Sequence, residues 1–174
     1  MEKYFELSIR NSTIKHNYDN HDGQIPFWAA VEVMSFSTLS KYIKNLSSKP
    51  NSPFSKLSAY YSYKTDKGNM TCPSHDMFTS WVHSVVVLRN ICAHNSRIYN
   101  RSLTTKPTII KTDQQRPQPK FYGLYHFLFA MKYLRPSDTS WNEFVVKFKR
   151  HLQQYQSYID IQKIYFPVDW EKHL

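Results

Sequence analysis

The residues best suited to chemistry lie in one short stretch, where Arg89, Asn90 and His94 are followed closely by Asn95 and Arg97. An imidazole exchanges protons near neutral pH, and a guanidinium stabilises negative charge that develops on a phosphorus centre. These are the groups that RNA cleavage without a metal ion requires. His94 would handle the proton of the 2′-hydroxyl or of the leaving group, Arg89 would offset charge on the phosphorane, and Asn90 would orient either group or the phosphate.

The spacing of these residues sets a condition on how they can act together. Arg89 and His94 are five positions apart, which is about 140° around an α-helix, so one helix does not stack them on one face. Two copies packed across a two-fold axis could aim both pairs into one shared cleft. The residues alone leave a second interpretation open, in which both side chains hydrogen-bond terminal carbonyls of a helix and complement its dipole. Asn95 is then best interpreted as a left-handed cap that supports the helix end.

A run of basic residues follows the same stretch. Lys and Arg number 23 against 13 Asp and Glu, which gives a formal net charge of +10 and favours a polyanionic partner. Lysines and arginines neutralise a nucleic-acid backbone without reading its sequence, but a solvated loop explains any single residue of the run as well. We expect RNA contacts from Arg97 and Arg101 only, because they come directly after Arg89 and His94. The remaining members are Lys106, Lys111, Arg116 and Lys120.

The helix that must position these residues has the strongest pattern in the chain. Apolar residues recur at helical intervals from Met77 to Cys92, with Ser74 as N-cap and Asp76 in the first turn, and they predict a helix over about 75–94. Other apolar-periodic segments are expected to be helices, with Ser140 and Glu143 as a capping box for the last of them. These segments are 26–46, a short helix from Phe54, 122–134 and 140–158.

The 174 residues, 20.8 kDa, fit one domain over 1–174, and 16% aromatic residues argue against a disordered basic chain. With no strand alternation, the pattern predicts an all-α bundle with long loops. Residues 1–25 are interpreted as a helix fragment and loop, 100–120 as a loop, and 165–174 as a docked tail. Tyr60, Tyr61, Tyr63, Tyr122 and Tyr125 could stack bases, but their regular spacing favours core packing.

Several classes of site are absent from the sequence. No glycine-rich phosphate loop is present, and Cys72 and Cys92 form no C-x-x-C pair. The histidine pairs His16 with His21 and His75 with His83 lack a matching carboxylate cluster, so we expect no metal and no cofactor. No apolar run is long enough for a membrane span and no signal peptide is apparent, so the expected location is the cytoplasm.

The motif residues also carry a resemblance. Arg89-Asn-x-x-Ala-His94 with Asn95-x-Arg97 resembles the R-x4-6-H motif of HEPN-superfamily ribonucleases and, more narrowly, the Abi family of abortive-infection phage-resistance proteins. Three further stretches resemble that family in the same order, with Ser37 in place of a family glycine. They are 25–36 with its P-x-W-x-x-x-E-x-x-S-F pattern, 42–46 and 166–170.

Family chains are usually longer at the N-terminus, so the likeness is to their C-terminal part. The resemblance implies a HEPN-like bundle, a homodimer, and metal-independent cleavage of tRNA or another cellular RNA in phage defence or a toxin-antitoxin setting. It leaves room for an antitoxin partner or an N-terminal specificity region. Glu32, from the P-x-W-x-x-x-E-x-x-S-F stretch, is interpreted as a supporting residue that pairs with an arginine.

The alternative is a non-catalytic helical module that binds RNA or a protein, in which the same helix end is structural and the net charge supplies affinity. A basic DNA-binding protein is a weaker interpretation, because no recognition-helix pattern is present.

Overall fold

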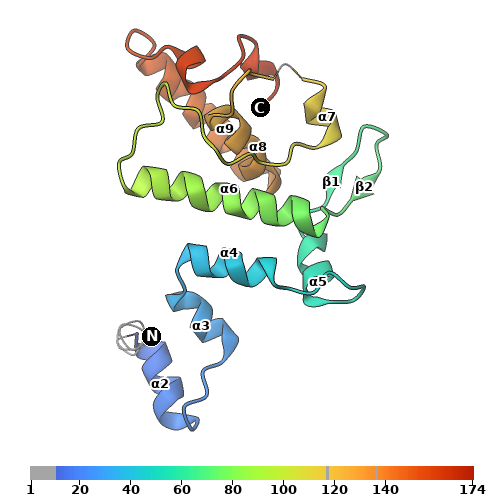
Figure 1. Ribbon diagram of the computed structural model, residues 1–174, viewed down its shortest axis with the longest axis vertical. Helices are drawn as coiled ribbons and strands as arrows, with labels where there is room; N and C mark the ends of the chain where they lie inside the picture. The colour runs from blue at the N-terminus through green and yellow to red at the C-terminus, as the bar shows by residue number, and fades with distance from the viewer. Residues whose placement is uncertain (1–10, 117, 136) are drawn as a thin grey trace. The chain divides into compact units, whose positions relative to one another are not determined.

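The computed structural model describes residues 11–116, 118–135 and 137–174, and helices dominate these ranges (Figure 1). This confirms the predicted all-α class, whereas the likeness to a HEPN bundle stays a prediction. The chain divides into two compact units, 1–42 and 43–174. Each unit is described by itself, and the expectation of a single domain stays a prediction.

The first unit holds α2 (Ser12–Asn20), α3 (Phe27–Val33) and most of α4 (Phe36–Lys44). The predicted continuous helix over 26–46 is wrong, because the backbone becomes extended at Met34, with ψ of 137°. The side chain of Ser35 then starts α4 by accepting a hydrogen bond from the Thr38 backbone N–H at 3.1 Å. The Ser35 hydroxyl competes with the helical backbone in the way that favours this residue type at helix starts. The sequence interpretation of residues 1–10 lies outside the described residues.

A short helix and a hairpin open the second unit. α5 (Pro53–Ala59) begins after Ser52, whose hydroxyl accepts from the Ser55 N–H at 3.3 Å. Strands β1 (Tyr63–Lys64) and β2 (Met70–Thr71) then pair antiparallel, Tyr63 opposite Thr71. The sequence shows no strand alternation and does not predict this hairpin, in which Gly68, with φ of +82°, lets the chain turn back on itself.

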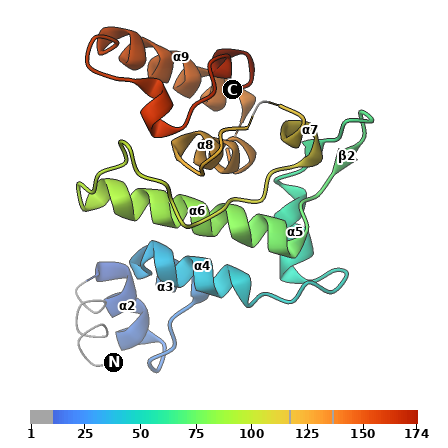
Figure 2. The same cartoon turned by 45° about the horizontal axis from the view of Figure 1, so that its top comes forward.

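Helix α6 (His75–Ala93) is the longest element of the second unit and begins where the sequence predicts. The Ser74 hydroxyl caps it by accepting from the Met77 N–H at 3.3 Å. Its buried face carries large side chains that include Phe78, Trp81 and Leu88. Helix α8 (Leu124–Tyr133), buried over much of its surface, packs against α6, as Figures 1 and 2 both show.

The long segment between α6 and α8 runs back along α6 and contains the short helix α7 (Lys111–Gln114). The indole N–H of Trp81 donates to the Thr108 carbonyl at 2.7 Å, and the Thr108 N–H donates to the Ser80 hydroxyl at 3.0 Å. Leu103 lies in the core beside Leu88. The described part of the predicted loop over 100–120 therefore packs against α6 and contains one helical turn.

Helix α9 (Asp138–Gln154) and the C-terminal segment complete this unit. The predicted capping box at Ser140 is wrong, because Ser137 is the N-cap and its hydroxyl accepts from the Ser140 N–H at 3.2 Å. Two single-turn 3-10 helices follow, η1 (Ile161–Ile164) and η2 (Trp170–Lys172). Phe166 and Trp170 are buried in a cluster with residues of α8 and α9, so the tail packs against both helices.

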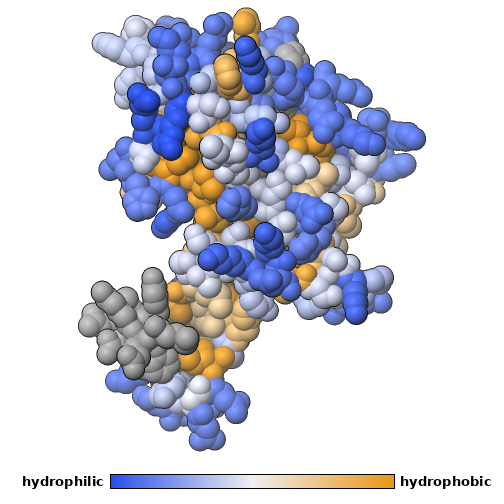
Figure 3. Space-filling view, viewed as in Figure 1, coloured by the Kyte–Doolittle hydropathy of each residue, from blue (hydrophilic) through white to orange (hydrophobic). Residues whose placement is uncertain are grey.

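The face of the second unit seen in Figure 3 is mostly polar. Figure 3 shows hydrophilic side chains over much of its visible face, with smaller apolar patches between them. No helix within the described ranges has both the length and the apolar character needed to cross a membrane.

A buried histidine of α8 makes the stability of the fold depend on pH. His126 is 2% exposed, and its Nδ1 accepts from the Gly123 N–H at 3.4 Å. Burial lowers the pKa of this imidazole from 6.5 to about 4, because the charged form loses its hydration. Between these values the unfolded chain takes up a proton that the folded chain refuses, so stability falls as pH drops from about 6.5 toward about 4.

We expect the His126→Asn variant, which retains a hydrogen-bond acceptor, to lose this dependence. The wild type should lose about 3 kcal/mol of unfolding free energy across the window, on the basis of 1.36 kcal/mol per pKa unit. Urea denaturation at several pH values between 7 and 4 measures both slopes. Parallel curves for the two proteins would contradict the assignment to His126.

Candidate functional site

The predicted motif lies at the C-terminal end of α6 and is open to solvent. Arg89 and His94 are exposed and Asn90 is half-buried. The guanidinium of Arg89 donates to the side-chain carbonyl of Asn90 at 3.2 Å, so these two residues are brought together. Arg89 and His94 form no hydrogen bond with each other in the described part of the chain, as their separation around the helix predicts.

The end of α6 is capped by backbone groups alone. Asn95, with φ of +48°, has the left-handed conformation predicted for it. The N–H of Asn95 donates to the Cys92 carbonyl at 3.1 Å and that of Ser96 donates to the Ile91 carbonyl at 2.9 Å, which is the Schellman arrangement. The N–H of His94 donates to the Asn90 carbonyl at 3.0 Å.

This capping argues against hydrogen bonds from the motif side chains to the terminal carbonyls of α6. In that interpretation Arg89 and His94 satisfy terminal carbonyls, but three of those carbonyls already accept backbone N–H groups. Within the described residues, neither side chain donates to a backbone carbonyl. Both therefore remain available to a ligand or to a second copy of the chain.

The basic run that follows α6 divides into different environments. Arg97 and Arg101 are exposed, and Arg101 reaches back to the Arg97 carbonyl at 3.4 Å, a long contact that leaves most guanidinium donors free for solvent or ligand. The ammonium of Lys106 lies 5.3 Å from the centre of the Tyr122 ring. Arg116 is committed to a buried ion pair, so it is not part of a freely solvated loop.

Glu32 is an exposed residue of α3 and belongs to the unit of residues 1–42. Its predicted role as a partner of an arginine near the motif stays a prediction. Within the described ranges, no group of three or more His, Cys, Asp or Glu side chains is arranged to hold a metal ion.

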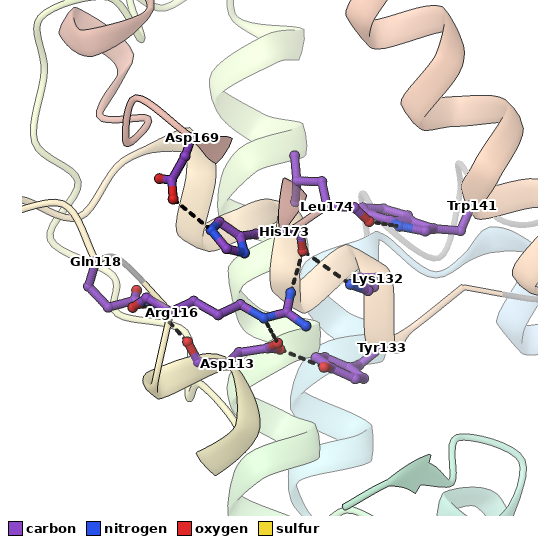
Figure 4. Close-up of polar contacts among 9 residues, drawn as sticks. All are labelled: Asp113, Arg116, Gln118, Lys132, Tyr133, Trp141, Asp169, His173 and Leu174. Atoms are coloured by element: carbon purple, nitrogen blue, oxygen red, sulfur yellow. Dashed lines mark hydrogen bonds and ion pairs between the residues drawn. The ribbon is translucent and has the colours of Figure 1, made fainter. Parts of the chain in front are cut away.

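A second polar cluster, not anticipated from the sequence, centres on Asp113, which is fully buried (Figure 4). The hydroxyl of Tyr133 donates to Asp113 Oδ2 at 2.5 Å. Arg116 Nε lies 3.1 Å from Asp113 Oδ1 without an aligned N–H, so this contact is an ion pair and Oδ1 lacks a hydrogen bond among the described residues. Burial, and then the bond to Asp113, raise the pKa of Tyr133, which stays a protonated donor.

The same cluster reaches the C-terminal segment. Arg116 Nη1 donates to the His173 carbonyl, and Lys132 Nζ donates to the same oxygen at 3.4 Å. The His173 ring contacts the Asp169 carboxylate at 3.1 Å (Figure 4). The Asp113-x-x-Arg116 spacing is the only signal in the sequence, and it is too common to indicate a buried pair by itself.

The chain is similar to one known protein family over its first 100 residues. The family described as Abi-like protein matches residues 1–100. The chain belongs to this family. The match contains Glu32 and the whole stretch from Arg89 to Arg97, and it ends before Asp113. Membership suggests a role in abortive infection, a form of phage defence, and is compatible with a nuclease.

Neither the search of curated proteins nor the search of solved structures gave a match.

Two aspartate–arginine pairs with the same spacing allow a matched test of the buried cluster. Asp113 and Arg116 form one pair with a 1% exposed carboxylate, whereas Asp138, which accepts from Arg135 Nε at 2.8 Å, is 82% exposed. We expect Asp113→Asn to lower the unfolding free energy by about 3 kcal/mol, because it leaves Arg116 without its counter-charge. The matched Asp138→Asn change should cost less than about 1 kcal/mol, because water screens the exposed pair.

Urea denaturation at pH 7 measures both free energies on the same protein. Equal losses for the two variants would show that the Asp113 pair does not hold this part of the fold together.

Proposed function

We propose that this Abi-like protein is a metal-independent RNA endonuclease that acts in phage defence, with its active site formed at a homodimer interface. Arg89, Asn90 and His94 are the proposed catalytic residues. The observation that supports the proposal is the exposed end of α6, which is capped by backbone groups. There the Arg89 guanidinium is hydrogen-bonded to the Asn90 side chain, and the His94 imidazole is exposed close by in the sequence.

The chemistry that these side chains support is transesterification at phosphorus. The 2′-oxygen forms a bond to the adjacent phosphorus, and the bond from phosphorus to the 5′-oxygen breaks. The proton lost by the 2′-hydroxyl is balanced by the proton gained by the leaving 5′-oxygen, and His94 accepts the first or donates the second. Arg89 stabilises charge on the phosphorane. The products are a 2′,3′-cyclic phosphate and a 5′-hydroxyl, so no water enters this step. Exposed Arg97 and Arg101 supply phosphate contacts next to the cleavage site.

A second copy of the chain is part of the proposal because of helix geometry. Arg89 lies in α6 and His94 is its C-cap residue, and helical spacing puts the two about 140° apart around the helix axis. We infer that one copy does not present both to one phosphate. A two-fold axis close to the helix end places Arg89 of one copy near His94 of the other and repeats the arrangement for the second pair.

The deciding experiment incubates the purified protein with total RNA and with transfer RNA in EDTA and maps the product ends. We expect cyclic-phosphate termini from the wild type and a loss of at least about 100-fold in cleavage rate for His94→Ala, the usual contribution of a general acid or base. His83→Ala is the matched control, because His83 is another exposed histidine of the same helix. Its rate should match the wild type.

Mixing inactive His94→Ala with inactive Arg89→Ala protein tests the shared site. Recovery of cleavage in the mixture, where neither variant cleaves alone, is expected if the two residues meet across the interface. Cleavage by His94→Ala at the wild-type rate would overturn the catalytic assignment.

A non-catalytic RNA-binding module is the second candidate, and one observation favours it. The side chains of Arg89 and His94 do not contact each other in the described single chain, so a monomer offers charge without an assembled site. In that case RNA binding persists without cleavage, and Arg97→Ala or Arg101→Ala lowers the salt dependence of binding by about one phosphate contact each.

A further inference from the structure

A cavity of about 600 Å³ lies within the second unit, at the opposite end of α6 from the motif. The start of the hairpin forms one wall, α7 with Arg116 another, and the junction of α8 and α9 the third. Tyr133, on its wall, stacks on Trp81 with ring centres 5.1 Å apart. By helix rise, Trp81 is about 12 Å from Arg89 and about 20 Å from His94. The cavity is therefore a separate site, of a size typical for small ligands.

The charged side chains that line this cavity leave an excess of positive charge. Four cations face two carboxylates there: Lys64, Arg116, Lys132 and Arg135 against Asp113 and Asp138. Each carboxylate is already paired with an arginine. No described carboxylate lies within ion-pair distance of Lys132.

Lys132 is the most informative of these residues. Its ammonium is half-buried, and its one hydrogen bond in the described chain is the 3.4 Å contact with the His173 carbonyl. Burial lowers its pKa, and the opposing effect of the carboxylates of Asp113 and Asp138 does not fully offset this. The ammonium also lies 5.9 Å from the centre of the Phe129 ring, but neither this ring nor the His173 carbonyl carries a full negative charge. A half-buried cation with no paired carboxylate is costly, and residues that break the usual rules in this way concentrate at binding sites. An anion in the cavity would supply the missing counter-charge.

An aromatic residue stands beside these cations. Tyr60 lines the cavity and is nevertheless 86% exposed, so the sequence expectation of core packing is wrong for this residue. Tyr61 and Tyr63, by contrast, pack against the core cluster as expected. An exposed ring next to unpaired positive charge is an arrangement with which proteins stack a nucleobase and hold its phosphate.

We propose that this cavity binds the phosphate of a nucleotide, with Lys132 facing the phosphate and Tyr60 stacking on the base. The ligand is a free mononucleotide or the 5′-phosphorylated end of an RNA chain, which share this chemistry. Binding here does not require RNA cleavage at the end of α6, so the two proposals succeed or fail separately.

Isothermal titration calorimetry of the full chain with 5′-AMP tests the site directly. We expect saturable binding that Lys132→Met weakens by at least about tenfold, the value of one charge-assisted hydrogen bond. The same variant should melt at the wild-type temperature or above it, because it replaces a half-buried ammonium that has no paired carboxylate with an apolar side chain. Lys147→Met, at an exposed lysine of α9, is the matched control and should bind like the wild type.

Further probes separate the contacts and the source of the ligand. Tyr60→Ala should weaken 5′-AMP by about fivefold or more and leave inorganic phosphate unchanged, because only the base stacks. A short RNA with a 5′-phosphate that binds more tightly than its 5′-hydroxyl form and than 5′-AMP identifies an RNA end, and the reverse order identifies a free nucleotide. Absence of binding by 5′-AMP, inorganic phosphate and both RNAs, or unchanged affinity in Lys132→Met, would overturn the proposal.

Discussion

The buried carboxylate of Asp113 is the interaction on which the second unit depends. It accepts a hydrogen bond from the Tyr133 hydroxyl of α8 and forms an ion pair with the guanidinium of Arg116, which follows α7. Arg116 also donates a hydrogen bond to the His173 carbonyl. A charge that is fully excluded from water must be compensated locally, so the positions of α7, α8 and the C-terminal segment are set by the need to supply that compensation. Through the stacking of Tyr133 on Trp81, the same constraint reaches α6.

The N-terminal part of α6 is buried in the core, whereas the side chains that could do chemistry lie at its exposed C-terminal end. Its N-terminal half is buried around Phe78 and Trp81, where helix α8 and the segment that contains Thr108 pack against it. Its C-terminal end is exposed and capped by its own backbone, so Arg89 and His94 carry no packing role. Changes at these two positions therefore act on function without the loss of fold that complicates mutations in a buried site.

The sequence predicts well those features that depend on neighbouring residues. The apolar spacing and the Ser74 cap predict α6 to within one residue, and the continuous apolar character of 122–134 predicts buried α8. The left-handed cap at Asn95 is confirmed, because that conformation is a local property of the residue at a helix end. The motif stands out in the sequence because its residue types are unusual at the end of an apolar helix.

Two kinds of feature escape the sequence: short local features hidden by a stronger pattern, and contacts between distant residues. The break after Val33 comes from a Ser35 hydroxyl that the helical period of the surrounding apolar residues conceals. The hairpin strands are two residues each, too short for any alternation to be visible.

Asp113 is buried only because Tyr133, 20 positions away, and Arg116 meet it in the fold. A polar residue in a Thr- and Pro-rich segment predicts exposure, and only the tertiary arrangement reverses that. The same reasoning explains Lys132, whose charge lies in a cavity walled by segments from three separate parts of the chain. The motif is thus accessible to sequence reasoning because it is local, and the cavity is not because its charge balance exists only after folding.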